Sequence, residues 1–176
     1  MRLDIARADV RRWGLIKALY MRVMWRLEKH LGVRLFVVHS RVLDSNVPED
    51  DMPEGCSARM LEMDELLVFC RDPSIDLSQS FVAQACARGD VCFGYLDRGT
   101  LVAYEWIAAK PTPADAELWV RFGDGYSYSY KAFTLPSHRG RHLQECLVHL
   151  SDPWRMSQGS RYNIGYIDTR NFASIV

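Results

Sequence analysis

The 176-residue sequence lacks several patterns that would place it outside the ordinary globular class. No apolar run approaches the roughly 18 residues that a membrane-spanning helix needs. Charged residues also interrupt the N-terminal segment where a secretory signal would have its apolar core. No internal repeat and no low-complexity tract is visible. With 48% hydrophobic and 25% charged residues, the composition is that of a chain that buries a core.

The five cysteines are odd in number, and none of them forms a CxxC pair. They fit no zinc pattern and no disulfide framework, which favours buried free thiols and a cytoplasmic location. The histidines have no ligand spacing either, so we expect no metal ion.

Positive charge is concentrated near the N-terminus, although the whole chain has a net charge of zero. Residues 1–34 contain nine basic and three acidic residues, a net charge of +6, and the remainder carries −6. Apolar residues recur at three- and four-residue steps over 10–31, which predicts an amphipathic helix ending at Gly32. Two interpretations stay open: the helix docks on its own domain with its arginines in water, or it makes peripheral contact with an anionic membrane. Nucleic-acid binding is not expected, because the rest of the chain is acidic and no recognition module follows.

An acidic, proline-containing segment at 44–55 is the clearest boundary in the chain. It separates an N-terminal region, 1–55, which contains the helix and a strand over 33–39, from a main domain at 56–176. In the main domain, periodicity and turn signals predict strands at 56–61, 91–96, 100–108, 117–122, 126–133 and 163–167, and helices at 64–71, 77–88, 139–150 and from Asn171.

One strand of the main domain runs through a turn into a helix, and this junction carries the strongest functional signal. A helix N-terminus leaves backbone N–H groups unpaired and has a partial positive charge, so it binds phosphate readily. Here Arg139 and Arg141 add positive charge, and Gly140 lets the backbone approach a ligand closely. The junction therefore predicts an anion site.

From about Cys56 to its end, the sequence resembles the GNAT (Gcn5-related N-acetyltransferase) superfamily. The resemblance rests on the segment Phe133–Gln144, on the strand before Asp168, and on Asn171–Ser174. The family's pyrophosphate turn is written Q/R-x-x-G-x-G/A. Arg139 fits its first position, whereas His142 and Gln144 replace the glycine and the Gly/Ala.

The resemblance implies an α/β (α+β) fold with a mixed, mostly antiparallel central sheet flanked by helices, preceded here by a helix–strand extension. In this family a central strand splays, and acyl-CoA, the co-substrate, inserts its pantetheine beside that strand. By position, the backbone of Phe133, Thr134 and Leu135 would contact the pantetheine, and Asn171 its arm or thiol end. The pyrophosphate cradle would consist of Arg139, Gly140, Arg141, His142, Leu143 and Gln144.

The reaction that the resemblance implies is direct attack of an amine, on a small molecule or a peptide, on the thioester. It requires a general base. Glu105 is the first candidate, because it lies among aromatic residues where burial would raise its pKa; alternatively it faces solvent or pairs with an arginine. Glu117 is a weaker candidate. Tyr126, Tyr128 and Tyr130 share one face of a strand, which could line an acceptor pocket or form aromatic core.

Chains of this superfamily normally continue past the helix at Asn171 into two more strands. We therefore expect either a longer protein or completion of the sheet by another chain, as in a homodimer; otherwise the sheet keeps an open edge. The alternative function is that of a catalytically inactive GNAT-like binding or regulatory module, which associates with a membrane or a protein through its basic N-terminal helix.

Overall fold

The computed structural model describes residues 10–45, 52–114, 118–172 and 174. The chain divides into two compact units, one formed by residues 1–39 and 166–176 and the other by Ser40–Gly165. In chain order the elements are α2 (Leu15–Leu31), β1 (Phe36–Val42), β2 (Cys56–Leu61), α3 (Met63–Phe69), α4 (Gln79–Arg88), β3 (Val91–Asp97), β4 (Thr100–Ala108), β5 (Thr112–Pro113), β6 (Trp119–Val120), β7 (Tyr126–Thr134), the 3-10 turn η1 (Pro136–His138), α5 (Leu143–Leu150), α6 (Asp152–Ser157) and β8 (Tyr162–Asp168).

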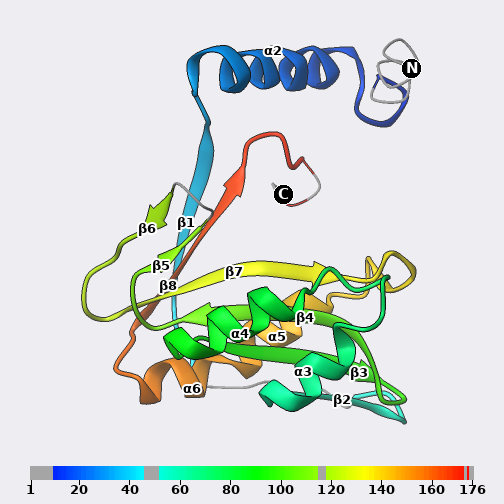
Figure 1. The fold of residues 1–176 in the computed structure, drawn as a ribbon, viewed down its shortest axis with the longest axis vertical. Helices are drawn as coiled ribbons and strands as arrows, with labels where there is room; N and C mark the ends of the chain where they lie inside the picture. The colour runs from blue at the N-terminus through cyan, green and yellow to red at the C-terminus, as the bar shows by residue number, and fades with distance from the viewer. Residues whose placement is uncertain (1–9, 46–51, 115–117, 173, 175–176) are drawn as a thin grey trace. The chain divides into compact units, whose positions relative to one another are not determined.

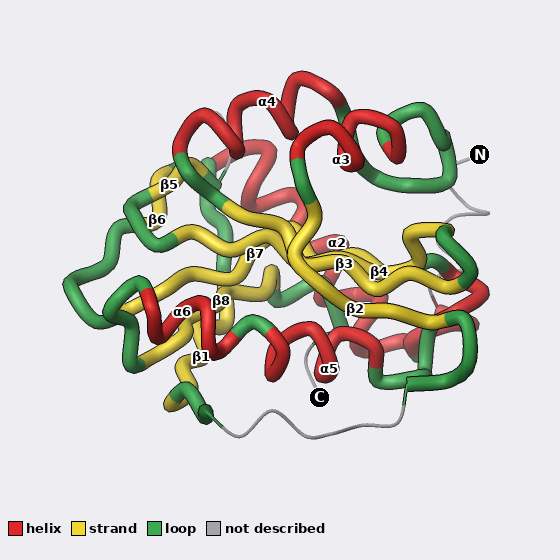
Figure 2. The backbone as a smooth tube through the Cα atoms, turned by 90° about the horizontal axis from the view of Figure 1, so that it is seen from below, coloured by secondary structure: helices red, strands yellow, loops and turns green. Residues whose placement is uncertain are grey.

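A six-stranded sheet with the order β1-β8-β7-β4-β3-β2 is the main element of the fold (Figure 1). The neighbours from β2 to β7 pair antiparallel, whereas β7 and β8 pair parallel. Helices α3 and α4 cover one face of this sheet, and α5 and α6 cover the other (Figure 2). This architecture confirms the predicted mixed, mostly antiparallel sheet flanked by helices.

Strand β4 lies at the centre of the core, and every residue after Thr100 in it is buried. Its side chains alternate between the two faces, as the pleat of a strand requires. Tyr104 and Trp106 pack in the cluster that contains residues of α3 and α4, whereas Ala103 and Ile107 pack with Leu147 of α5 and its neighbours.

The predicted elements of the main domain agree with the structure where the pattern was local. The strand predicted at 56–61 is β2, and the predicted hairpin is β3 and β4. Besides the helix predicted from Asn171, two predictions for this domain were wrong. The strand predicted at 117–122 is the two-residue β6 in its described part, and the helix predicted from Arg139 begins at Leu143, because Arg139 is extended and Gly140 has a positive φ of 76°.

The first unit contains α2 and the segment after β8. The predicted helix over 10–31 is interrupted at Gly14, whose φ of 82° is left-handed, and it ends at Gly32 as expected. Tyr20 donates its hydroxyl hydrogen to Thr169 Oγ1 at 2.7 Å. Asn171 accepts a backbone hydrogen bond in a turn, so the helix predicted from this residue is not present in its described part. None of the described helices combines the length and the apolarity that crossing a bilayer requires.

Strand β1 forms the edge of the sheet beyond β8. Backbone bonds from Thr169 N–H to Leu35 O and from Leu43 N–H to Arg161 O flank the pair and show that it is antiparallel. The edge of β8, for which the sequence predicted no partner strand within this chain, is therefore paired with β1 of the same chain. The N-terminal region and the main domain, which the segment 44–55 separates in sequence, share one sheet.

Gly94 of β3 is the glycine whose replacement tests the packing of this core. A Cβ atom there would lie 2.4 Å from Leu61 Cδ1 and 2.9 Å from Leu101 Cδ1, and both leucines are buried. We expect Gly94→Ala to lower the free energy of unfolding by about 1–3 kcal/mol, measured by urea denaturation. Gly123→Ala is the matched control, because its Cβ meets nothing within 4 Å. Equal stability of the two variants would contradict this packing.

Candidate functional site

Strands β7 and β8 separate soon after they start. Their parallel pairing runs from Tyr126↔Tyr162 to Tyr128↔Ile164, and β7 then continues to Thr134 with no strand paired on that side in the described chain. On its other side, β7 carries a β-bulge. Glu105 alone on β4 lies opposite Lys131 and Ala132, and Lys131 has a φ of 45°. A bulge bends a strand and increases its twist, so the second half of β7 presents a free backbone edge.

The backbone orientation at the end of β7 follows from one hydrogen bond. Leu135 N–H donates to Val102 O at 2.8 Å. In an antiparallel pair, residues alternate between facing the partner and facing away, so Phe133 also turns its backbone groups toward β4. Thr134 turns its groups to the free edge, where its carbonyl accepts a hydrogen bond from Arg139 Nε at 3.3 Å. Of the three residues predicted to contact pantetheine, Thr134 is therefore the one with free-edge orientation.

The predicted cradle follows β7 directly and ends at the α5 N-terminus. Arg139, Gly140 and Arg141 are exposed there. The N–H groups of the first α5 residues, Leu143 to Glu145, have no acceptor within the helix and none elsewhere on the described backbone. Two exposed cationic side chains, of which Arg139 contacts Thr134 O, therefore lie at the end of the free edge, beside a row of N–H donors that have no partner on the described backbone.

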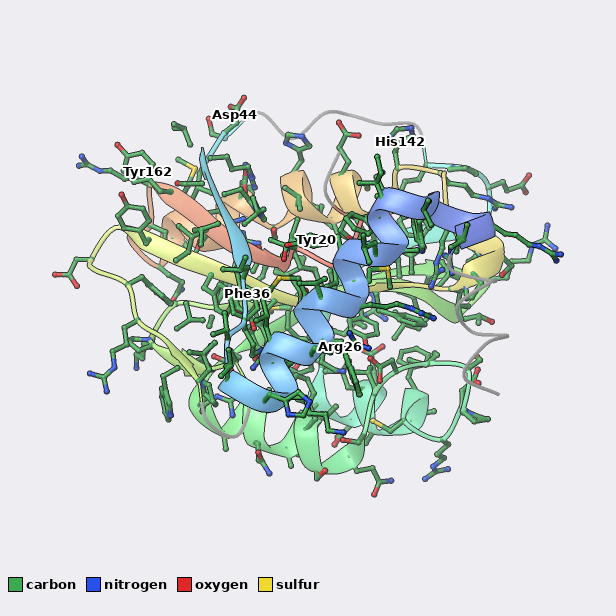
Figure 3. The ribbon with its side chains drawn as sticks, turned by 90° about the horizontal axis from the view of Figure 1, so that it is seen from above. Tyr20, Arg26, Phe36, Asp44, His142 and Tyr162 are labelled. Atoms are coloured by element: carbon green, nitrogen blue, oxygen red, sulfur yellow. The ribbon has the colours of Figure 1, made fainter. Side chains whose placement is uncertain are left out.

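Both departures from the family's turn have visible structural consequences. His142, labelled in Figure 3, is the N-cap of α5 and has a φ of 56°, a left-handed conformation that glycine adopts without strain. Gln144 turns its amide nitrogen back onto the strands, where it donates to Phe133 O at 2.7 Å, Thr134 Oγ1 at 3.0 Å and Tyr104 O at 3.2 Å. The predicted cradle therefore contains a strained histidine and a glutamine bound across the end of β7.

Glu105 does not lie in an open site. It is 3% exposed, and its carboxylate is 3.3 Å from the guanidinium of Arg155. Burial raises the pKa of the Glu105 carboxyl above its usual value, and the positive charge of Arg155 opposes that shift. The geometry matches the alternative reading, in which Glu105 pairs with an arginine, and leaves it without access to an acceptor amine. Glu117, the weaker candidate, lies outside the described residues.

Arg155, on α6, is the residue that sequence reasoning missed. It is fully buried, and each of its N–H groups has an acceptor. The acceptors come from three strands, β4, β7 and β8, and from the junction before α6: Glu105 Oε2, Ser127 Oγ, Ser129 Oγ, Asn163 Oδ1 and Ser151 Oγ. A buried arginine so distant in sequence from Glu105 leaves no local signal.

The same buried network extends to strand β1. Asp152, fully buried beside Arg155, accepts a bidentate hydrogen bond from the guanidinium of Arg41, which also donates to Val148 O at 3.1 Å. Bidentate charge-assisted bonds are strong and directional. They hold β1 against the end of α5 and the start of α6.

The three tyrosines of β7 do not form one open pocket. Tyr128 is buried and stacks on Tyr130 at a centroid distance of 5.4 Å, whereas Tyr126 stacks on Tyr162. Tyr130 donates its hydroxyl hydrogen to Asp90 at 2.7 Å, and burial raises its pKa. Aromatic packing therefore accounts for these side chains.

Two other features lie near the free edge or the cradle. Lys131, at the bulge, places its ammonium 3.0 Å from Asp76 and over the ring of Phe81. A cavity of about 830 Å³ lies between α5 and strands β2 and β3, and Arg141 and His142 of the predicted cradle are part of its wall. Asn171 belongs to the first unit and the cradle to the second, so its predicted contact with the cofactor stays a prediction. No group of three or more His, Cys, Asp and Glu side chains among the described residues could hold a metal ion.

No family model matches this sequence, and no curated protein matches it. Solved structures match it in fold. An aminoglycoside acetyltransferase from an uncultured soil metagenomic sample, solved with trehalose, aligns with a TM-score of 0.50 and 10% identity, over 70% of this chain and 84% of that one. This chain therefore has a fold like that of this acetyltransferase. Further matches are yncA of Salmonella typhimurium, solved with its cofactor acetyl-CoA (TM-score 0.47, 16% identity, 69% of this chain and 75% of that one), and a GCN5-related N-acetyltransferase from Ralstonia eutropha (0.46, 17%, 65% and 85%). At these identities the likeness concerns the fold alone.

The buried ion pair generates a prediction about stability and pH. Arg155→Met leaves the Glu105 carboxylate buried without its cation, which we expect to cost about 3–5 kcal/mol at neutral pH. In this variant the native state binds the carboxyl proton more tightly than the unfolded state does, so its stability should fall as the pH rises from about 5 to about 8. Chemical denaturation at several pH values measures both effects.

Two further variants make that measurement specific. Adding Glu105→Gln to Arg155→Met removes the titrating group, and the double variant should lose the additional pH dependence. Arg59→Met breaks the exposed Arg59–Glu65 pair and should cost at most about 1 kcal/mol. A loss of stability in Arg155→Met no larger than in Arg59→Met would contradict the role assigned to the buried network.

Proposed function

We propose that this chain is an acyltransferase that binds acyl-CoA along the free edge of β7 and transfers the acyl group to an amine of a small molecule or a peptide. The single observation that carries this proposal is the continuity of the site. The strand edge freed by the separation of β7 and β8 ends at an exposed, doubly cationic turn at a helix N-terminus. A long ligand with amides at one end and phosphates at the other fits such a path.

The chemistry of the donors supports this ligand. The N–H groups of Leu143 to Glu145, with Arg139 and Arg141 beside them, would hold the pyrophosphate. Because its carbonyl already accepts from Arg139 Nε, Thr134 would offer its backbone N–H to an amide oxygen of the pantetheine. Acyl-CoA, when bound, supplies a thioester whose carbonyl carbon an amine can attack without any protein nucleophile. The chain's own contribution is to orient that thioester at the bulge of β7.

Two side chains at the cradle act against tight binding. Glu145 places a carboxylate in the first turn of α5, where its Oε2 lies 3.1 Å from His142 Nδ1 and competes with an anionic ligand. Gln144 occupies the end of β7 with its amide. We therefore propose a cofactor affinity weaker than that of a cradle with glycine at both positions.

Charge reversal in the cradle tests the binding mode. Arg139→Glu and Arg141→Glu each replace attraction for the pyrophosphate with repulsion, and we expect each to weaken acetyl-CoA binding at least about tenfold, measured by isothermal titration calorimetry. Arg71→Glu, an exposed change after α3, is the control and should bind as the parent does.

A second assay measures turnover separately from binding. The protein is mixed with acetyl-CoA and one of a panel of primary amines, and chromatography measures the free CoA that the transfer releases. Absence of any heat of binding in the parent chain would refute the proposal. Binding that both arginine variants retain in full would refute the placement of the pyrophosphate.

Replacing His142 by glycine tests the effect of the strained N-cap. The change places glycine where a non-glycine residue in this left-handed conformation costs roughly 1–2 kcal/mol, and it restores the first glycine of the family's turn. We expect His142→Gly to bind acetyl-CoA several-fold more tightly than the parent in the same calorimetric assay. Arg98→Gly, which relieves a similar positive φ of 49° in the β3–β4 turn, controls for backbone relief alone. Equal affinities in the parent, His142→Gly and Arg98→Gly would remove His142 from the account of cofactor affinity.

A further inference from the structure

Helix α2 has one apolar face that packs in its own unit and another that is exposed. On the packed face, Ala18 and Met24 are buried, Trp13 just before the helix contacts the ring of Phe172, and Tyr20 binds Thr169. The exposed face lies on the other side of the helix. Its aliphatic members are Leu15 (71% exposed), Ile16 (85%), Leu19 (60%) and Val23 (46%).

These four residues are neighbours on the helix surface. Leu15, Leu19 and Val23 follow one another at four-residue steps, and Ile16 lies beside them because it precedes Leu19 by three residues. Contiguous exposed apolar patches on a soluble domain mark interaction surfaces, whereas single exposed residues do not. This stripe is therefore a candidate docking surface.

Two arginines lie beside the stripe, and the described residues of α2 place no carboxylate next to it. Arg22 and Arg26 are exposed and follow Leu19 and Val23 by three residues, which makes them neighbours on the helix surface (Arg26 is labelled in Figure 3). The acidic residue of the described N-terminal segment, Glu28, projects from the packed side. There it is held by Arg170 and by Arg34, whose Nε is 3.4 Å from it. The local acid is thus neutralised away from the exposed face.

We propose that this face of α2 docks on an anionic lipid surface, with Leu15, Ile16, Leu19 and Val23 among the acyl chains and Arg22 and Arg26 on the headgroup phosphates. An aliphatic stripe bordered by arginines is the composition of interfacial helices. Trp25, 54% exposed, adds a side chain that is enriched at membrane interfaces. A second copy of the same face would bring the arginines of both copies together, so charge complementarity favours lipid over self-association.

Vesicle sedimentation with the full chain tests this docking. We expect binding to equimolar phosphatidylcholine and phosphatidylserine, much weaker binding to phosphatidylcholine alone, and loss of binding at high salt. Each basic residue near an anionic bilayer contributes about a factor of five, so Arg22→Glu with Arg26→Glu should lower the partition coefficient by at least about 25-fold. Ile16→Glu with Leu19→Glu should lower it by at least about tenfold.

Matched controls separate the surface from general effects. Arg22→Lys with Arg26→Lys keeps the charge and should still bind. Val68→Glu changes an exposed apolar residue of α3, 56% exposed, and should bind as the parent does. Failure of the parent to sediment with anionic vesicles, or undiminished binding by both α2 variants, would overturn the proposal. Light scattering that shows a dimer abolished by Ile16→Glu with Leu19→Glu would assign the face to self-association and overturn it as well.

Discussion

The buried guanidinium of Arg155 is the constraint on which the rest of the second unit depends. It binds Glu105 of β4, Ser127 and Ser129 of β7, and Asn163 of β8, and every one of its donors is satisfied. An arginine can be buried only when its charge and its hydrogen bonds are matched in this way. Since Ser127 and Asn163 also form one of the last backbone pairs of β7 with β8, the network fixes the point at which the two strands part. The free edge begins where this cluster ends.

That separation creates the proposed site, and the bulge at Lys131 reinforces it. With β8 gone on one side and an extra residue inserted on the other, β7 turns its last backbone groups outward. The predicted cradle follows within a few residues. The two residues that differ from the family's turn, His142 and Gln144, affect different parts of it. His142 stores backbone strain at the N-cap, whereas Gln144 binds the strand carbonyls directly. Residues held in sparsely populated backbone conformations are characteristic of functional sites, so the strained position agrees with a role for this turn.

How much the sequence could predict depended on whether the deciding interaction was local. Strand β2 and the β3–β4 hairpin were predicted well because alternation and a turn signal lie within a few residues. The pairing of β1 with β8 joins segments more than a hundred residues apart, and nothing local marks it. The interruption of the N-terminal helix at Gly14 was not predicted, because the apolar periodicity continues on both sides of this residue. The turn between β7 and α5 lies where the sequence predicted a turn, but the start of α5 was placed too early, since a positive φ at Gly140 and at His142 delays the helix.

Glu105 shows why the identity of a site residue is harder to predict than its position. Placing it in a strand among aromatic residues was right, and so was the expectation that burial raises its pKa. Burial of a carboxylate is compatible with two different roles. It can raise the pKa so that the carboxylate accepts a proton, or it can accompany an ion pair with a fixed cation. The choice depends on Arg155, which α6 brings to the same face of the sheet from fifty residues away. Arg155 binds Oε2 of this carboxylate, and the Glu105 side chain is only 3% exposed. In the proposed transfer, the proton of the attacking amine therefore leaves by a route that does not pass through this buried pair.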